Sequence, residues 1–253
     1  MTRTLLMLLV ACMPFSAISR EDVRVNENDW PPYFFKGNVN EPEGLGKELL
    51  QLCLPKTGHN YHFDHLPIKR MWQSIMSGEL DINIFSRRPD RETLLYFGKE
   101  PIFTASYRPV VRVSSSINIT DSQDFDELML GHLAGLKYSP EYLAYVEGRI
   151  ENGGVHISYS NHSLMRMLLA GRIDVYVNTS DTVLWNAKRL GVRNNIKILD
   201  FDIRSGDYFV TLSKKSPRIK DKPGFLRIVD ACLAELKENG KYAEILNRYT
   251  MQP

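Results

Sequence analysis

One short pattern of residues occurs twice in this chain, at positions 93 residues apart. At 70–84 and again at 164–177, an apolar segment with helical spacing leads into a glycine, a charged residue, an aliphatic residue, an aspartate and a strand-like run. Gly78 and Gly171 stand where each helix should end, because glycine adopts left-handed backbone angles without a Cβ clash. The runs that follow are typical of strands buried on both faces. The repeat therefore predicts two similar lobes, and a cleft between two lobes suits a small ligand.

Around the repeat, strand-like and helix-like segments alternate, which predicts an α/β fold. Each lobe should hold a mostly parallel sheet flanked by helices, and the chain should cross between the lobes twice, near 108–112 and near 202–206. We predict lobe 1 at 20–110 with 205–253, and lobe 2 at 111–204. The predicted helices include 47–54, 67–77, 140–147, 161–170, 225–238 and 241–249. The predicted strands include 23–25, 61–66, 81–85, 94–103, 107–113, 175–177, 196–201 and 208–212.

The N-terminus has the layout of an export signal. A positively charged start precedes an apolar core at 5–11, and residues 17–19 fit a small-x-small cleavage site. The core is too short to span a bilayer. We therefore predict a signal peptide at 1–19 and a soluble periplasmic protein. The alternative is lipid anchoring at Cys12, because the residues before it also resemble a lipoprotein box.

The overall charge argues against a nucleic-acid partner. Lys and Arg number 32 against 30 Asp and Glu, a net charge of +2, and no basic stripe is present. His59, His62 and His65 fall across a turn and a strand among hydrophobic neighbours, so we predict neither a metal site nor a cofactor. We expect a monomer.

Two cysteines remain after cleavage, Cys53 and Cys232, and both lie in apolar helical patterns. In an oxidising compartment they could form a single disulfide. Because sequence does not show whether they are close in space, we favour two buried free thiols.

The order and spacing of several short motifs resemble the bacterial extracellular solute-binding proteins of family 3, the amino-acid-binding subunits of ABC importers. The motifs are an aromatic-proline loop at 30–33, a glycine turn at 44–46, 78–81 with Arg91 and Phe97 downstream, 131–135, 171–174, and the ending from 213 to 249. The resemblance implies a two-lobed periplasmic-binding-protein fold of type II, whose lobes close on a small polar solute. It also implies a membrane permease or a sensor as the partner.

The resemblance suggests which residues of lobe 1 face the ligand. Arg91 matches the arginine that pairs with the ligand's α-carboxylate, a task that suits the guanidinium fork. Trp30 matches the aromatic residue that covers the ligand. The other candidates in lobe 1 are Tyr33, Ser86, Arg87 and Arg88.

In lobe 2, candidates follow the predicted strands, at the edge where open α/β sheets bind ligands. They are Lys137, Tyr138, Asn178, Thr179 and Asp181. Thr179 aligns with the acid that usually takes the ligand's α-ammonium group, and Asp181 is a possible substitute. This departure, the basic loop 86–91 and Lys137 in place of a threonine together favour a more anionic ligand.

Each candidate also has a structural alternative. Arg91 could form an ion pair with Asp81 or Glu92, the neighbouring arginines could be solvated, and the aromatic residues could belong to the core. For Asp81 and Asp174 we favour a structural role in their turns.

Three functions remain open at this stage, and the favoured one is a binding protein without catalysis. The second is a periplasmic enzyme on the same fold, similar to dehydratases that act on cyclohexadienyl acids, for which Glu100, His132 or Asp181 could act as the acid or base. The third is an interaction module that has lost its ligand.

Overall fold

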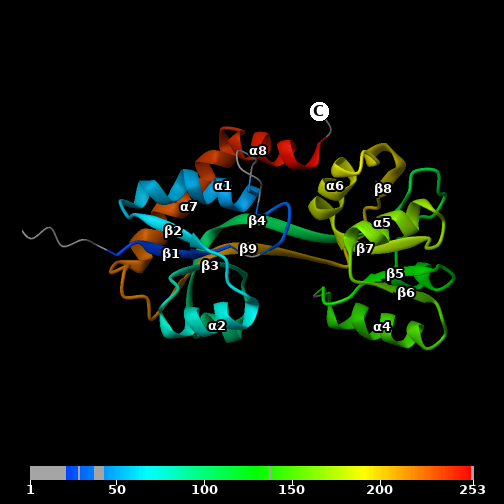
Figure 1. Cartoon of the computed structure of the whole chain (residues 1–253), viewed down its shortest axis with the longest axis horizontal. Coiled ribbons are helices and arrows are strands. Elements are labelled where there is room, and N and C mark those ends of the chain that lie inside the picture. Colours follow the sequence, from blue (N-terminus) through cyan, green and yellow to red (C-terminus); the bar gives the residue numbers. More distant parts are fainter. Residues whose placement is uncertain (1–20, 28, 37–42, 137, 252–253) are drawn as a thin grey trace, which may run out of the picture.

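The structure is a computed structural model that describes residues 21–27, 29–36, 43–136 and 138–251. Two lobes lie side by side and are joined by two long strands, β4 (Leu95–Arg112) and β9 (Arg204–Ser213) (Figure 1). These strands pair with each other antiparallel through the junction. Within the described residues, no helix is both long and apolar enough to cross a membrane.

Lobe 1 is built on three parallel strands in the order β2-β1-β3, with β9 added antiparallel beside β3. The strands are β1 (Val23–Asn26), β2 (Tyr61–Asp64) and β3 (Ile82–Ser86). The helices of this lobe are α1 (Leu45–Cys53), the 3-10 turn η1 (Leu54–Thr57), α2 (Ile68–Ser77), α3 (Pro89–Glu92), α7 (Lys222–Glu238) and α8 (Lys241–Thr250). In Figure 1, α1, α7 and α8 cover one face of the sheet and α2 lies on the other.

Lobe 2 repeats this plan with β5 between β6 and β7, all parallel, and with β4 antiparallel beside β7. Its strands are β5 (Leu130–Leu133), β6 (Val155–Ser158), β7 (Val175–Thr179) and the short β8 (Ile196–Ile198), which pairs with β4. Its helices are η2 (Ser122–Phe125), α4 (Pro140–Ile150), α5 (Asn161–Leu169), α6 (Ser180–Arg189) and η3 (Arg193–Asn195). The predicted α/β class, with mostly parallel sheets and two crossings, is confirmed.

The repeated sequence pattern forms the same unit twice, α2 followed by β3 and α5 followed by β7. Gly78 and Gly171 have φ angles of 88° and 70°, the left-handed region that glycine tolerates. Asp81 accepts a hydrogen bond from the backbone N–H of Arg24, at 2.8 Å. Asp174 accepts one from the N–H of Met129, at 2.9 Å. Each aspartate therefore ties its turn to the first strand of its own lobe, the structural role favoured above.

Several boundaries differ from those predicted. The predicted strands 94–103 and 107–113 are one continuous strand, β4, and the loop 86–91 contains α3. The helix α5 is capped by Ser160, whose side chain accepts a hydrogen bond from the N–H of Ser163. Strand β6 and helix α6 were not predicted. The polar ends of α6 and the exposed residues of β6 hide the periodicity that would have shown them.

Cys53 and Cys232 form a disulfide between α1 and α7. The prediction of two free thiols is therefore wrong, because α1 and α7 pack against each other and bring together residues 179 positions apart. The bond lies inside the hydrophobic core of lobe 1.

Each lobe has its own hydrophobic core, and two aromatic side chains pack against both. Trp30 and Tyr208 are partly buried against the cluster of lobe 1 and against the cluster of lobe 2 that contains Tyr107 and Tyr138. These aromatic residues mark the boundary where the lobes meet.

We expect Gly78→Ala to destabilise the protein more than Gly171→Ala. Both substitutions put a side chain at a positive φ, which disfavours the folded state by about 1–2 kcal/mol. At Gly78, the added Cβ would also lie 2.5 Å from the carbonyl oxygen of Lys215, whereas the nearest contact at Gly171 is 3.9 Å away. Urea unfolding of the two variants measures the difference, and equal losses would contradict it.

We expect the non-reduced mature protein to yield a Cys53–Cys232 linked peptide on proteolytic mapping. Breaking this bond should lower the free energy of unfolding by about 2–5 kcal/mol. Cys53→Ser, Cys232→Ser and the double variant remove the same bond, so their urea midpoints should agree closely. Free thiols detected in the folded wild-type protein would refute the pairing.

Candidate functional site

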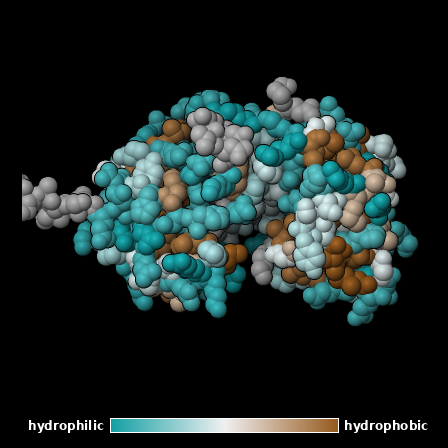
Figure 2. Space-filling view, viewed as in Figure 1, coloured by the Kyte–Doolittle hydropathy of each residue, from teal (hydrophilic) through white to brown (hydrophobic). Residues whose placement is uncertain are grey.

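The two lobes touch at one end of their boundary and stand apart at the other. At the closed end, Thr182 donates a hydrogen bond to the carbonyl oxygen of Pro31 at 2.8 Å, and the rings of Phe35 and Trp185 lie 5.5 Å apart. On the side of α2 and α4, Figure 2 shows an open notch between the lobes. The ends of the strands that carry the predicted site residues converge on this boundary.

Arg91 and Ser86 lie together at the end of β3. Arg91 Nη1 donates to the carbonyl oxygen of Ser86 at 2.9 Å and lies 3.0 Å from Ser86 Oγ. The guanidinium also rests on aromatic faces, 4.9 Å from the ring centre of Phe85 and 5.7 Å from that of Trp72. Its Nε is buried and has no hydrogen-bond partner among the described residues. The guanidinium is thus held in place by neutral groups through Nη1, while its buried Nε makes no hydrogen bond within the described residues.

Charges of both signs act on Arg91. Burial, and then the charge of Arg88, lower the pKa of the Arg91 guanidinium from its usual value; Asp90 and Tyr208 oppose this shift, and Arg204 adds to it. Tyr208, on β9, is hydrogen-bonded to both Ser86 and Tyr107. Burial raises the pKa of Tyr208, so its hydroxyl stays neutral near neutral pH. The group around Arg91 is therefore cationic and rich in neutral hydroxyls, a combination that suits an anion.

The other two arginines of the loop point elsewhere. Arg87 pairs with Glu92 at 2.7 Å and lies 4.9 Å from the ring centre of Phe97. Arg88 is exposed and makes two hydrogen bonds to Asp90, at 3.0 and 3.2 Å. Of the three, Arg91 alone is held against Ser86. Arg91 does not form the alternative ion pair with Asp81 or Glu92, because Asp81 pairs with Arg218 and Glu92 pairs with Arg87.

The aromatic-proline loop contributes one partly exposed and one buried ring. Trp30 stands edge-on to Tyr208, with ring centroids 4.9 Å apart. Tyr33 is fully buried and stacks on Phe103 at 3.8 Å. Trp30 is thus placed at the boundary, while Tyr33 reaches it only through its hydroxyl.

In lobe 2, Tyr138 lies near the boundary and two other predicted residues lie behind it. The Tyr138 ring is 5.8 Å from that of Tyr107 and 5.1 Å from that of His132. Asn178 donates to Asn161 at 2.5 Å, and Thr179 donates to Thr182 at 2.7 Å, both from buried positions. Lys137 lies outside the described residues.

Asp181 is engaged by the other lobe. The Tyr33 hydroxyl donates a hydrogen bond to Asp181 Oδ2 at 2.9 Å, across the boundary. Burial raises the pKa of the Asp181 carboxyl, and the hydrogen bond from Tyr33 opposes that rise. Burial, and then the negative charge of Asp181, raise the pKa of the Tyr242 hydroxyl on α8. The carboxylate therefore faces the closed end of the boundary and joins the lobes there.

Four residues at this boundary were not among the predicted ligand-binding set: Tyr107, His132, Arg204 and Tyr208. The pairing of β4 with β9 places Tyr107 opposite Arg204 and Phe103 opposite Tyr208. These partners are far apart in sequence, so only the sheet register reveals them. Burial lowers the pKa of His132, whose Nδ1 is buried and unpartnered within the described part of the chain.

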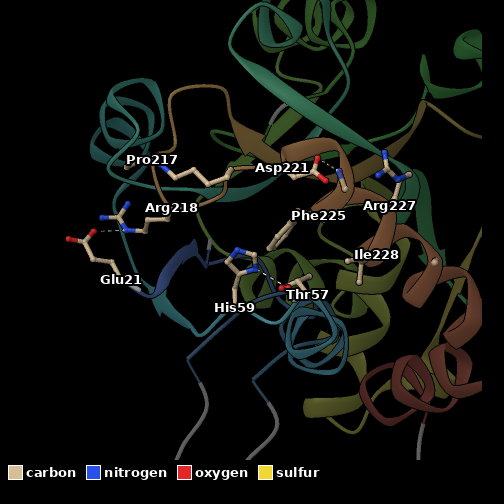
Figure 3. Close-up of a pocket in the computed structure, with 12 residues that line it drawn as sticks. Glu21, Thr57, His59, Pro217, Arg218, Asp221, Phe225, Arg227 and Ile228 are labelled. Carbon is tan, nitrogen blue, oxygen red and sulfur yellow. Dashed lines mark hydrogen bonds and ion pairs between the residues drawn. The ribbon is translucent and has the colours of Figure 1, made fainter. Parts of the chain in front are cut away.

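A separate groove of ≈ 880 Å³ lies on the outer surface of lobe 1 (Figure 3). Its wall includes the Glu21–Arg218 ion pair, at 3.2 Å, and His59 beside Phe225. Its lining contains none of the predicted site residues. The chemistry therefore favours the boundary between the lobes as the functional site, although the groove is a well-defined hollow.

Known proteins are similar to this chain in sequence profile and in fold. The sequence profile of the bacterial extracellular solute-binding proteins, family 3, matches residues 24–252. No curated protein is significantly similar in sequence.

Solved structures share the fold at low sequence identity. A substrate-binding domain of a putative amino acid ABC transporter from Streptococcus pneumoniae Canada MDR_19A is 18% identical with a TM-score of 0.70, covering 91% of this chain and 100% of that one. The open substrate-binding domain 2 of GlnP from Lactococcus lactis is 17% identical with a TM-score of 0.70, covering 92% and 97%. The ligand-binding core of GluR0 from Nostoc punctiforme, in complex with L-glutamate, is 19% identical with a TM-score of 0.61, covering 91% and 100%.

We expect Tyr33→Phe to lower the free energy of unfolding by about 1–3 kcal/mol at pH 7, because it leaves the buried Asp181 carboxylate without its donor. The Tyr33 hydrogen bond lowers the folded-state pKa of Asp181 and so favours its ionised form. The loss should therefore be full above that pKa and shrink as the pH falls through it. Urea unfolding at pH 7 and pH 4 measures both values.

Tyr176→Phe is the matched control for this prediction. The Tyr176 hydroxyl is also buried, but its acceptor is the uncharged sulfur of Met165, at 3.7 Å. Its loss should be small and the same at both pH values. If Tyr33→Phe also shows no pH dependence, the hydrogen bond does not act on an ionised Asp181.

Proposed function

The chain belongs to the bacterial extracellular solute-binding proteins of family 3, and we propose that it captures a small polar solute in the cleft between its lobes. The solute is an amino acid or a related carboxylate. The observation that carries this proposal is Arg91, which is fixed by Ser86 and by two aromatic faces and retains an unpaired buried Nε. A guanidinium held in this way is ready to bind a carboxylate.

Ligand capture requires the two lobes to close. We propose the lobe limits given by the sequence, 20–110 with 205–253 for lobe 1 and 111–204 for lobe 2, so that β4 and β9 bend between them. Trp30 and Arg91 contact the solute from lobe 1, and lobe 2 contributes the end of the chain segment that carries Tyr138. Contacts to both lobes favour the closed state over the open one, which is a shift in population.

The protein is placed outside the cytoplasm, in keeping with the extracellular family to which it belongs. Residues 1–19 act as its signal peptide, with a lipid anchor at Cys12 as the alternative. The similar structures include domains of ABC transporters and a glutamate-bound receptor core. By analogy, this monomeric chain hands its solute to a membrane permease or a sensor.

The proposed role needs no catalysis. A binding protein returns its solute chemically unchanged, whereas a dehydratase would convert it. Mass spectrometry of the solute after incubation with the protein distinguishes the two.

We expect at least one compound of a library of amino acids, dicarboxylates, polyamines and small peptides to raise the melting temperature of refolded residues 20–253. At about 100 times its dissociation constant, a ligand stabilises the folded protein by about 2.7 kcal/mol. Arg91→Ala should abolish the shift, because it removes the carboxylate anchor. Differential scanning fluorimetry is the measurement.

Arg172→Ala is the matched control, because Arg172 is exposed and lies before β7, at the end of that strand opposite to the site. It should leave the ligand-induced shift intact. A shift that survives Arg91→Ala would remove Arg91 as the anchor. The absence of any shift would favour the interaction-module alternative.

A further inference from the structure

The charges at the boundary restrict the ligand further than the presence of a carboxylate group. Arg91 is bonded to neutral oxygen atoms of Ser86. The two acids nearest to it in sequence are already paired, Asp90 with Arg88 and Glu92 with Arg87. The site therefore presents a cation whose neighbouring carboxylates are committed to other arginines, so it has an excess of positive charge to be balanced by a ligand.

The two residues that could accept a hydrogen bond from a ligand's α-ammonium group already have other partners. Thr179, at the end of β7, is neutral, buried and bonded to Thr182. Asp181, in the first turn of α6, accepts a hydrogen bond from the Tyr33 hydroxyl and lies towards α8. A buried ammonium group without a charged partner is strongly disfavoured. Thr179 and Asp181 are thus both engaged in hydrogen bonds within the protein.

Two partly exposed aromatic rings, Trp30 and Tyr208, lie between these two ends with their centroids 4.9 Å apart. Tyr107, which is hydrogen-bonded to Tyr208, and Tyr138 lie buried behind them in the core of lobe 2. His132, beyond Tyr138, has a lowered pKa from burial and is neutral near neutral pH. Such rings favour an apolar or ring-shaped body over a second charged group.

We infer that the site takes a carboxylate with an apolar or ring-shaped body and without an α-ammonium group. This inference rests on the proposed function, since it specifies the solute that the same cleft binds. It assigns the Arg91 guanidinium to the carboxylate, Trp30 and Tyr208 to the body, and Asp181 to the contact between the lobes.

Matched pairs of compounds test the inference on refolded wild-type protein, residues 20–253 with the disulfide intact. Each pair contains an acid and the amino acid with the same body: propanoate and L-alanine, 4-methylpentanoate and L-leucine, 3-phenylpropanoate and L-phenylalanine, and glutarate and L-glutamate. Isothermal titration calorimetry should show the acid binding about tenfold or more tightly than its amino acid, because a buried unpaired polar group lowers affinity by at least that factor. 2-Phenylethylamine, which has the ammonium group alone, should not bind.

The outcomes separate the inference from the proposed function. Tighter binding of the amino acid in any pair overturns the inference and supports the proposed function; Asp29, exposed beside Trp30, is then the carboxylate to mutate next. No binding by any of these compounds overturns the inference, and the wider library screen then decides the proposed function separately. If each acid binds more tightly than its amino acid, Arg91→Ala must abolish binding of the acids. A preference for the acids that persists in Arg91→Ala shows that another site is responsible and overturns the assignment.

Discussion

The antiparallel pairing of β4 with β9 is the constraint on which the rest of the structure depends. β9 extends the sheet of lobe 1 beside β3, and β4 extends the sheet of lobe 2 beside β7, so the ladder between β4 and β9 connects the two sheets. Its register places Tyr107 opposite Arg204 and Phe103 opposite Tyr208, directly at the boundary. Since β3 pairs with β9 through Ser86 and Tyr208, the ladder also fixes the position of the Arg91 anchor. A shift of one residue would turn these side chains to the other face of the sheet.

The boundary between the lobes combines two kinds of contact. At one end, the Tyr33–Asp181 and Thr182–Pro31 hydrogen bonds hold α6 to the aromatic-proline loop. At the other end, the lobes part beside a guanidinium that neutral groups orient but do not neutralise. Binding of an anion there would neutralise the Arg91 guanidinium and bring lobe 2 towards lobe 1 about the two strands.

Much of this fold could be predicted from sequence, because the signals are local. The repeated helix-glycine-strand pattern identified both lobes, and Gly78 and Gly171 have the positive φ angles expected at helix ends. The Cys53–Cys232 bond could not be predicted, since it depends on how α1 packs on α7. The basic loop did not show where its arginines point, because Arg87 and Arg88 pair with acidic neighbours while Arg91 turns to Ser86. The tyrosines of the boundary are brought together by register alone.

Small-angle X-ray scattering of the refolded mature protein tests the central claim most directly, which is that an anionic solute bound at Arg91 closes the lobes about β4 and β9. We predict that the carboxylate with the highest measured affinity lowers the radius of gyration of the wild-type protein and leaves that of Arg91→Ala unchanged. Binding that leaves the wild-type radius unchanged, or a decrease that persists in Arg91→Ala, would contradict this account.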